Sequence, residues 1–163
     1  MPAIVMGVDP GLQCTGIGIV QVWPGKVEYV AHAVVRTDAK ASLPERLGTI
    51  CEGIRDAVAE YKPSVAAVED VFYSVNVKSA MLLGQTRGAI IATLLSENMK
   101  VSEFTALQIK KAVVGYGKAD KQQVKKMVEV LLNKKMGNVP ADVTDALACG
   151  ICLGFNLTGR LNF

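Results

Sequence analysis

Four acidic residues stand where apolar segments of the chain begin or end. Asp9 closes the first apolar run, and Glu69 directly follows another short one. Asp142 and Asp145 are three residues apart at the start of an apolar helical segment, so their side chains share one helix face. Carboxylate oxygens without His or Cys partners select hard cations, Mg²⁺ or Mn²⁺. Two such ions, about 3.5–4 Å apart, activate water and stabilise the leaving oxygen in phosphodiester hydrolysis.

Each of these acids also has an ordinary structural explanation. Asp9 opens an Asp-Pro-Gly sequence that is typical of a turn, Glu69 would start a polar loop, and Asp142 would cap a helix. If the acids converge instead, their like charges raise one another's pKa values until cations neutralise them. Four carboxylates balance the charge of two divalent ions, so convergence of all four predicts a two-metal site.

Basic residues are concentrated between residues 100 and 135. This segment holds nine Lys and three acidic residues, whereas the whole chain has 18 basic and 15 acidic residues. Such a segment is typical of a surface that binds a polyanion, although a solvated helix face has the same composition. Lys118, Lys121 and Lys125 follow one another at helical neighbour spacings, which predicts salt-dependent contacts with a phosphate backbone.

Two aromatic residues follow Glu69 on a short polar loop. Phe72 and Tyr73 precede Asn76 and Lys78 in this loop. An aromatic ring that stacks on an unpaired base contributes about 1–3 kcal/mol to binding. The loop is therefore a candidate contact with nucleic acid; the alternative is that the rings are buried and anchor the loop itself.

The spacing of apolar residues predicts strands first and helices later. Strands are expected at 3–9, 15–22, 27–37, 65–68 and 101–104, and helices at 43–61, 77–98 and about 105–114, 120–133 and 142–156. Ser42 and Glu45 have the spacing of a capping box at the start of the first helix. Three strands joined by short links, followed by alternating helices and strands, indicate an α/β fold with a mixed sheet flanked by helices.

The composition is that of one ordinary globular domain, residues 1–163. Hydrophobic residues make up 50% of the chain and only 6 residues are Pro, which excludes a disordered or collagen-like protein. No apolar run reaches the roughly 18–20 residues that span a membrane, and the N-terminus lacks the basic start of a signal peptide. These features predict a cytoplasmic protein without a membrane partner.

The four cysteines fit this prediction. Cys149 and Cys152 form one C-x-x-C inside an apolar helical stretch. A structural zinc site needs four ligands, and the only histidine of the sequence, His32, is distant and is predicted to be structural. A thioredoxin-type pair stays open as an alternative to buried thiols that pack as small apolar groups.

Four motifs in the chain resemble, in order, those of the RuvC Holliday-junction resolvases of the ribonuclease H-like superfamily. The motifs are Gly7-Val8-Asp9-Pro10-Gly11 with Thr15-Gly16, Val68-Glu69-Asp70-Val71-Phe72, the segment 115–124, and Asp142-Val143-Thr144-Asp145-Ala146-Leu147-Ala148. The resemblance covers essentially the whole chain. It implies a ribonuclease H-like domain, with a mixed five-stranded sheet, that resolves four-way DNA junctions by paired symmetric nicks in recombination and repair.

The resemblance also implies ligands and partners. Asp9, Glu69, Asp142 and Asp145 would be the catalytic residues and would hold two Mg²⁺ ions, with Mn²⁺ as a substitute. The protein would act as a homodimer, together with a RuvA–RuvB branch-migration complex. The chain departs from the family in Asp70, where Glu or Gln is more usual, and in lacking a His near the last helix. Asp70 is expected to point away from the site if Glu69 points into it.

Contacts with DNA and between subunits follow from the same resemblance. An aromatic residue at the position of Phe72 stacks on an unpaired base, and basic residues at the positions of Lys110 and Lys121 lie near the cleaved strand. The long helix after the loop would form the dimer interface, where Gly84 and Gly88 leave a flat strip. The alternative is that this strip packs on the chain's own sheet.

Three other functions are compatible with parts of the pattern. Another ribonuclease H-like nuclease, acting on RNA or an RNA–DNA hybrid, would use the same carboxylates. An actin-like or sugar-kinase ATP site would use Asp9 and Gly11 with Thr15 and Gly16, but that class needs two such lobes and a longer chain. A junction-binding module without catalysis would bind the same DNA and leave it uncut.

Overall fold

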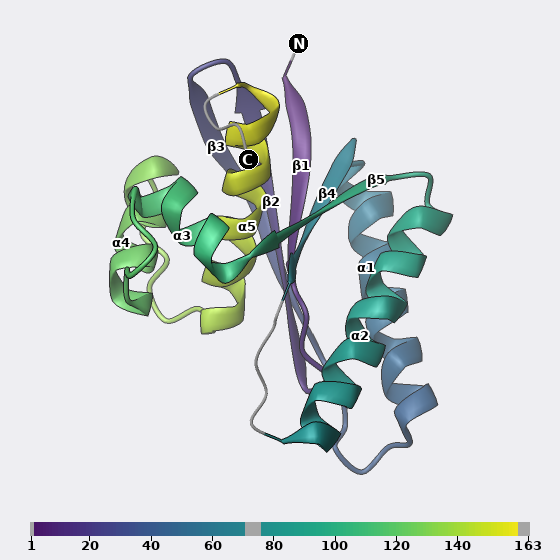
Figure 1. The fold of residues 1–163 in the computed structure, drawn as a ribbon. Helices are drawn as coiled ribbons and strands as arrows, with labels where there is room; N and C mark the ends of the chain where they lie inside the picture. The colour runs from purple at the N-terminus through teal and green to yellow at the C-terminus, as the bar shows by residue number, and fades with distance from the viewer. Residues whose placement is uncertain (1, 71–75, 160–163) are drawn as a thin grey trace.

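The computed structural model describes residues 2–70 and 76–159 of the chain (Figure 1). The strands are β1 (Ala3–Asp9), β2 (Cys14–Trp23), β3 (Lys26–Arg36), β4 (Val65–Asp70) and β5 (Lys100–Thr105). The helices are α1 (Leu43–Tyr61), α2 (Val77–Ser96), α3 (Ala106–Val114), α4 (Lys121–Leu131) and α5 (Ala141–Leu157). The elements follow one another in the predicted order, and their ends differ from the predicted ones by a few residues at most.

The five strands form one mixed sheet in the order β3-β2-β1-β4-β5. β1 pairs antiparallel with β2, and β2 pairs antiparallel with β3. β4 lies parallel to β1, and β5 lies parallel to β4. The predicted α/β fold is therefore confirmed. Because β1 and β4 are parallel neighbours, their C-terminal ends meet at the same edge of the sheet.

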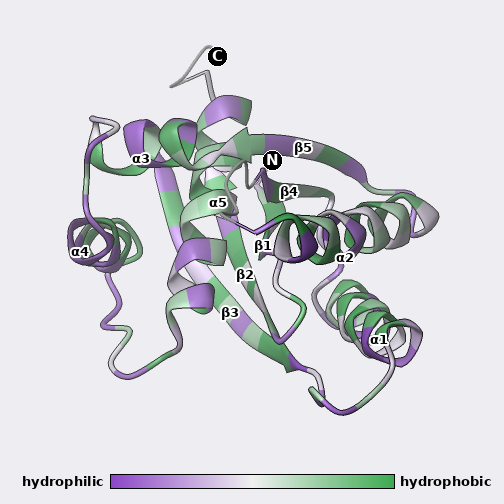
Figure 2. Ribbon diagram, turned by 60° about the horizontal axis from the view of Figure 1, so that its bottom comes forward, coloured by the Kyte–Doolittle hydropathy of each residue, from purple (hydrophilic) through white to green (hydrophobic). Residues whose placement is uncertain are grey.

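Helices cover both faces of the sheet, with α1 and α2 on one side and α3, α4 and α5 on the other (Figure 1, Figure 2). Successive side chains of a strand point to opposite faces, so β1 contributes to two separate cores. Met6 packs in the core that contains Ile50 of α1. Val5 packs in the core that contains Leu147 of α5.

Helix α5 packs on the sheet and against α3 and α4, and nearly all of its residues from Val143 to Phe155 are buried. Cys149 and Cys152 are both buried and unpaired. Burial raises the pKa of the Cys149 thiol well above its usual value and that of Cys152 to about 12. A redox thiol needs the opposite shift, so the thioredoxin-type alternative is wrong and the buried-thiol interpretation is confirmed.

The ends of α1 follow the sequence rules. Ser42 Oγ accepts a hydrogen bond from the Glu45 amide, and Glu45 Oε2 accepts one from the Ser42 amide at 2.8 Å, which confirms the capping box. The helix stops at Lys62, whose φ of 48° is left-handed, directly before Pro63. Within the described residues, no helix is long and apolar enough to cross a membrane.

Helix α2 presents a strip of small residues to open space. A Cβ placed on Gly84 or Gly88 would meet no atom within 4 Å outside the helix itself. The alternative that these glycines pack on the chain's own sheet is therefore wrong.

Candidate active site

Two of the predicted acidic residues are neighbours at the ends of adjacent strands. Val8 of β1 is in register with Val68 of β4, so Asp9 and Glu69 come next to each other. Both line one cleft of about 320 Å³. The two carboxyl groups are close enough for each to shift the pKa of the other. The sheet register thus brings together two carboxyl groups that are 60 residues apart in the sequence.

The first two turns of α5 bring Asp142 and Asp145 to the same cleft. The N-cap of α5 is Pro140, and no side chain makes a capping hydrogen bond. Asp142 therefore lies in the first turn, and the interpretation of this residue as an N-cap is wrong. Its charge is favoured there by the positive end of the helix dipole.

Two glycines allow α5 to approach the sheet closely. A Cβ on Gly7 of β1 would lie 2.0 Å from the carbonyl oxygen of Ala146. A Cβ on Gly16, the register partner of Asp9, would lie 2.1 Å from the carbonyl oxygen of Asp142. No larger residue fits at either position unless α5 moves. These glycines therefore set the separation between the strand-borne and the helix-borne carboxylates.

Burial and mutual repulsion favour protonation of Asp9, Glu69 and Asp145. Burial, followed by the charges of Glu69, Asp145 and Asp142, raises the pKa of Asp9 from 3.8 to about 9. Burial likewise raises the pKa values of Glu69 and Asp145. In the described part of the chain, no three acidic, His or Cys side chains are arranged as a finished metal site. Four crowded carboxyl groups, whose charge Lys110 and Lys121 balance only in part, nevertheless suit divalent cations.

We expect the metal-free protein to lose stability as the pH rises from 3.8 towards about 9. In this window the folded state keeps a proton on Asp9 that the unfolded chain releases, so the free energy of unfolding falls with rising pH. Asp9→Asn carries no charge, and we expect it to flatten this fall and to raise stability at pH 7 by about 1 kcal/mol or more. Thermal unfolding in EDTA, followed over this pH range, measures both effects.

The matched control for this experiment is Asp56→Asn on the exposed side of α1. It removes the same charge far from the cleft and should keep the wild-type pH profile. An Asp9→Asn profile identical to that of the wild type would show that another group holds the proton. Addition of Mg²⁺ at pH 7 should raise the unfolding temperature of the wild type more than that of Asp9→Asn.

Asp70 pairs with Arg87 of α2 at 3.2 Å and does not line the cleft, as predicted. The Arg87 side chain also donates from Nε to the main-chain oxygen of Glu69 at 3.2 Å and pairs with Glu103 of β5. Arg87 thereby fastens the end of β4 that carries Glu69 to both α2 and β5. Sequence reasoning missed this residue because a lone arginine on a helix has no motif that signals such contacts.

Two lysines form the basic wall of the acidic cleft. Lys110 of α3 and Lys121 of α4 both line it. Lys121 Nζ lies 3.7 Å from Asp145 Oδ2, and its side chain is 81% exposed. An approaching phosphate would therefore meet positive charge at the mouth of the cleft and carboxylates inside it.

The other predicted lysine contacts lie outside the cleft. Asp120 is the N-cap of α4, so Lys118 lies in the turn before the helix. The predicted helical spacing therefore joins only Lys121 and Lys125. Lys125 Nζ donates a hydrogen bond to the main-chain oxygen of Gly137 at 2.7 Å, which ties α4 to the segment that leads into α5.

The predicted aromatic loop lies partly outside the residues that the structure describes. Phe72 and Tyr73 lie outside the described residues. Asn76 is the N-cap of α2, and its side-chain oxygen accepts hydrogen bonds from the amides of Lys78, at 2.8 Å, and Ser79. Lys78 is exposed in the first turn of α2. The end of this loop is thus fixed to the beginning of α2.

Four carboxyl groups line a cleft at the edge of a mixed five-stranded sheet, and helices cover both faces of this sheet. This combination defines a nuclease of the ribonuclease H-like fold. The sequence profile of the family described as crossover junction endodeoxyribonuclease RuvC matches residues 5–153. The chain therefore belongs to the RuvC family.

Individual relatives agree with this assignment. RuvC of Ralstonia pickettii is 47% identical over 148 residues, which are 91% of this chain and 81% of the relative. RuvC of Dechloromonas aromatica is 49% identical over 147 residues, which are 90% of this chain and 82% of the relative. The solved structure of Thermus thermophilus RuvC in complex with a Holliday junction substrate is similar with a TM-score of 0.90 at 28% identity, over 97% of this chain and 96% of that one.

Proposed function

We propose that the protein resolves four-way DNA junctions by paired, symmetric, metal-dependent nicks. The observation that carries this proposal is the meeting of Asp9, Glu69, Asp142 and Asp145 in one cleft. The chain's membership of the RuvC family supports a DNA junction as the substrate. The similar Thermus thermophilus structure is named as a complex with a Holliday junction substrate.

The chemistry follows from the donor set of the cleft. We propose that the four carboxylates hold two Mg²⁺ ions, with Mn²⁺ as a substitute, and such ions activate water and stabilise charge on the leaving oxygen. The water oxygen forms a bond to phosphorus while the bond from phosphorus to the 3′ oxygen breaks. The 3′ oxygen takes up a proton, so the nick carries a 5′-phosphate and a 3′-hydroxyl. Lys110 and Lys121 attract the phosphate to the cleft.

The exposed face of α2 supports the proposal of a homodimer. Val77, Met81 and Leu95 are 77%, 62% and 56% exposed, and they share this helix with the open strip at Gly84 and Gly88. A second copy would cover these apolar side chains. A four-way junction has two-fold symmetry, so a two-fold dimer places one active site at each of two opposed strands.

The remaining proposals rest on family membership alone. We propose the RuvA–RuvB branch-migration complex as a partner. We also propose a cytoplasmic location, because the junctions that such an enzyme resolves arise in chromosomal DNA. Copurification of the protein with RuvA–RuvB from cell extract tests the first proposal.

Incubation with a mobile synthetic four-way junction, in Mg²⁺ or in EDTA, tests the proposed activity. Plain duplex and an RNA–DNA hybrid serve as competing substrates. Paired symmetric nicks on the junction alone, lost in EDTA, are the expected result. Cleavage of the hybrid instead would assign the protein to another branch of the superfamily. Tight junction binding without nicks on a set of junction sequences would identify a binding module.

Lys121→Ala is expected to weaken junction binding and to lower the salt slope of binding by about 1. Its exposed ammonium group at the mouth of the cleft is positioned to neutralise one phosphate. Titrations over a range of KCl concentrations, in EDTA, measure the slope. Lys100→Ala removes the same charge at the opposite end of the sheet and should leave the slope unchanged. A wild-type slope in Lys121→Ala would place this residue away from the phosphates.

A further inference from the structure

A series of connected grooves leads away from the acidic cleft along α4. The cleft shares Lys121 with a groove of about 170 Å³, and that groove shares Lys125 with one of about 630 Å³. The latter shares Lys126 and Lys135 with a groove of about 330 Å³. That groove shares Lys134 with a cavity of about 710 Å³ beside the turn between β2 and β3. Each step of this series, which we call the lysine path, includes a shared lysine.

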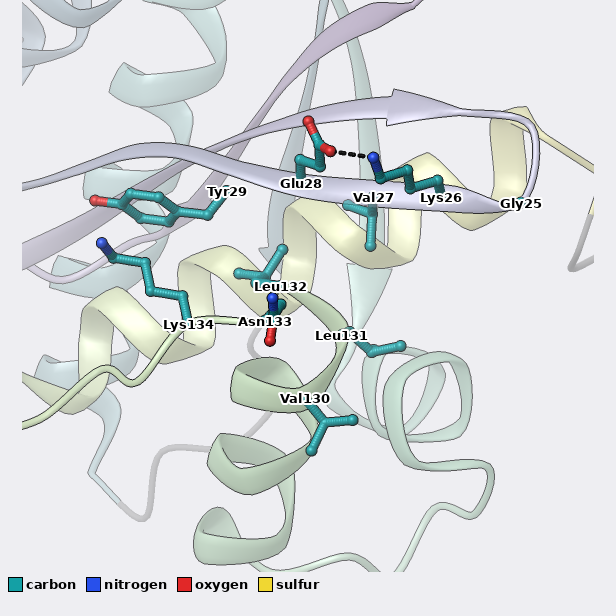
Figure 3. A pocket seen from close by; sticks show the side chains of 10 residues that line it. All are labelled: Gly25, Lys26, Val27, Glu28, Tyr29, Val130, Leu131, Leu132, Asn133 and Lys134. Carbon is teal, nitrogen blue, oxygen red and sulfur yellow. Dashed lines mark ion pairs between the residues drawn. The ribbon is translucent and has the colours of Figure 1, made fainter.

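The outer end of the lysine path lies between β3 and the end of α4 (Figure 3). Lys134 Nζ lies 4.3 Å from the centre of the Tyr29 ring, and Figure 3 shows the two side chains next to each other. A cation–π contact holds an ammonium group in place without neutralising its charge. Lys26, on the opposite wall, pairs with Glu28. The outer end therefore presents a positioned positive charge at Lys134.

The acidic residues of α4 and its N-cap make hydrogen bonds or ion pairs within the chain. Asp120 accepts a hydrogen bond from the Gln123 amide at 2.8 Å. Glu129 accepts one from the Met136 amide at 2.8 Å and lies 3.6 Å from Lys135 Nζ. The Glu129 side chain is 14% exposed, whereas that of Lys135 is 91% exposed. Ammonium groups, rather than carboxylates, therefore dominate the solvent side of the path.

The groove nearest to the cleft is lined by two lysines and by Thr144. Thr144 lines this groove together with Lys121 and Lys125. Its Oγ1 is buried and has no hydrogen-bond partner among the described residues. The two lysines would neutralise the charge of a phosphate placed in this groove.

We propose that one duplex arm of the junction lies along the lysine path, with its phosphates against Lys121, Lys125, Lys126, Lys134 and Lys135. This inference rests on the proposed function for the identity of the DNA. Helix α4 has 11 residues, so at 1.5 Å per residue it is about 16 Å long, which matches about five base pairs. Phosphate contacts position DNA without reading its sequence, so the path sets the direction in which an arm leaves the active site.

The test combines Lys134→Ala/Lys135→Ala with junctions that carry uncharged methylphosphonates. The methylphosphonates replace the phosphates at about four to eight base pairs from the branch point in one pair of opposed arms. Binding is measured in EDTA, so that no DNA is cut. We expect either change alone to weaken binding about tenfold, and the double variant to lower the salt slope by about 2. Together the two changes should weaken binding little more than either alone, because both remove the same contacts.

Two further variants control for loss of charge and for loss of structure. Lys62→Asn/Lys100→Ala removes two charges on the other side of the sheet, and its effect should add to that of the methylphosphonates. Asn suits the left-handed backbone at Lys62. Lys134→Arg/Lys135→Arg keeps both charges and should bind like the wild type.

The outcomes separate this inference from the proposed function. Fully additive effects of Lys134→Ala/Lys135→Ala and the methylphosphonates would overturn the lysine path, even if the protein resolves junctions normally. Equal effects of methylphosphonates placed near the far ends of the arms would overturn it as well. Non-additive effects without any cleavage in Mg²⁺ would support the path and contradict the proposed resolvase activity.

Discussion

Replacement of Asp9 by Asn is expected to reduce junction cleavage at least about a thousandfold, or about 4 kcal/mol in the activation barrier. Asp9 lies in the cleft where strand-borne and helix-borne carboxylates meet, so the charges of Glu69, Asp142 and Asp145 raise its pKa. The substitution keeps the shape of the side chain and removes one negative oxygen donor. We therefore expect loss of the chemical step while the binding of the junction stays within about threefold of wild type.

Single-turnover cleavage with protein in excess over junction measures the chemical step, and titration in EDTA measures binding. Asp56→Asn is again the matched control and should cleave at the wild-type rate. A normal rate in Asp9→Asn would refute the assignment of this carboxylate to the metals. Parallel loss of binding and cleavage would instead indicate that Asp9 supports the fold of the cleft.

Gly7→Ala is expected to lower the free energy of unfolding by about 3 kcal/mol or more. The added methyl group would lie 2.0 Å from the Ala146 oxygen and 2.5 Å from the Gly150 nitrogen, both in the main chain of α5. Main-chain atoms of a buried helix have no rotamer that relieves such a contact, so the whole helix must move. Because α5 carries Asp142 and Asp145, cleavage should fall together with stability.

Thermal unfolding measures this effect, and a loss of about 3 kcal/mol corresponds to a fall of about 10 °C in a domain of this size. Gly48→Ala is the matched control, because Gly48 lies inside α1 with no atom within 4 Å of the added Cβ. We expect that change to stabilise the protein by about 0.5–1 kcal/mol. Similar behaviour of the two variants would show that α5 tolerates displacement from β1.

Local patterns were sufficient to predict the elements of this fold. The capping box of Ser42 and Glu45 and the stop at Lys62 depend on residues within a few positions of one another, so the bounds of α1 agree with the prediction. Apolar periodicity depends on equally short segments, which is why the order of strands and helices was also predicted. Alternatives stayed open where a neighbour in space decides, as at Gly84 and Gly88, whose strip faces open space rather than the chain's own sheet.

The acidic site was predicted residue by residue, but its geometry was not. A carboxylate at the end of an apolar run is conspicuous in any sequence, and all four of these acids line the same cleft. That Asp9 and Glu69 lie next to each other depends on the register of β1 with β4. The contacts of Arg87 with the Glu69 main chain and with Asp70 depend on how α2 crosses the sheet, and no short motif encodes that.

The sequence by itself determined the order of the elements, the four carboxylates and the presence of a basic segment, because each is a property of residues close together in the chain. The tertiary structure decided which charges meet. Close packing of α5 on Gly7 and Gly16 brings helix-borne acids to strand-borne ones, which raises the pKa of Asp9 to about 9. The lysines of α4 and of the segment after it form one path that begins at this cleft. The grooves of this path lie between packed elements, so only the tertiary structure could reveal them.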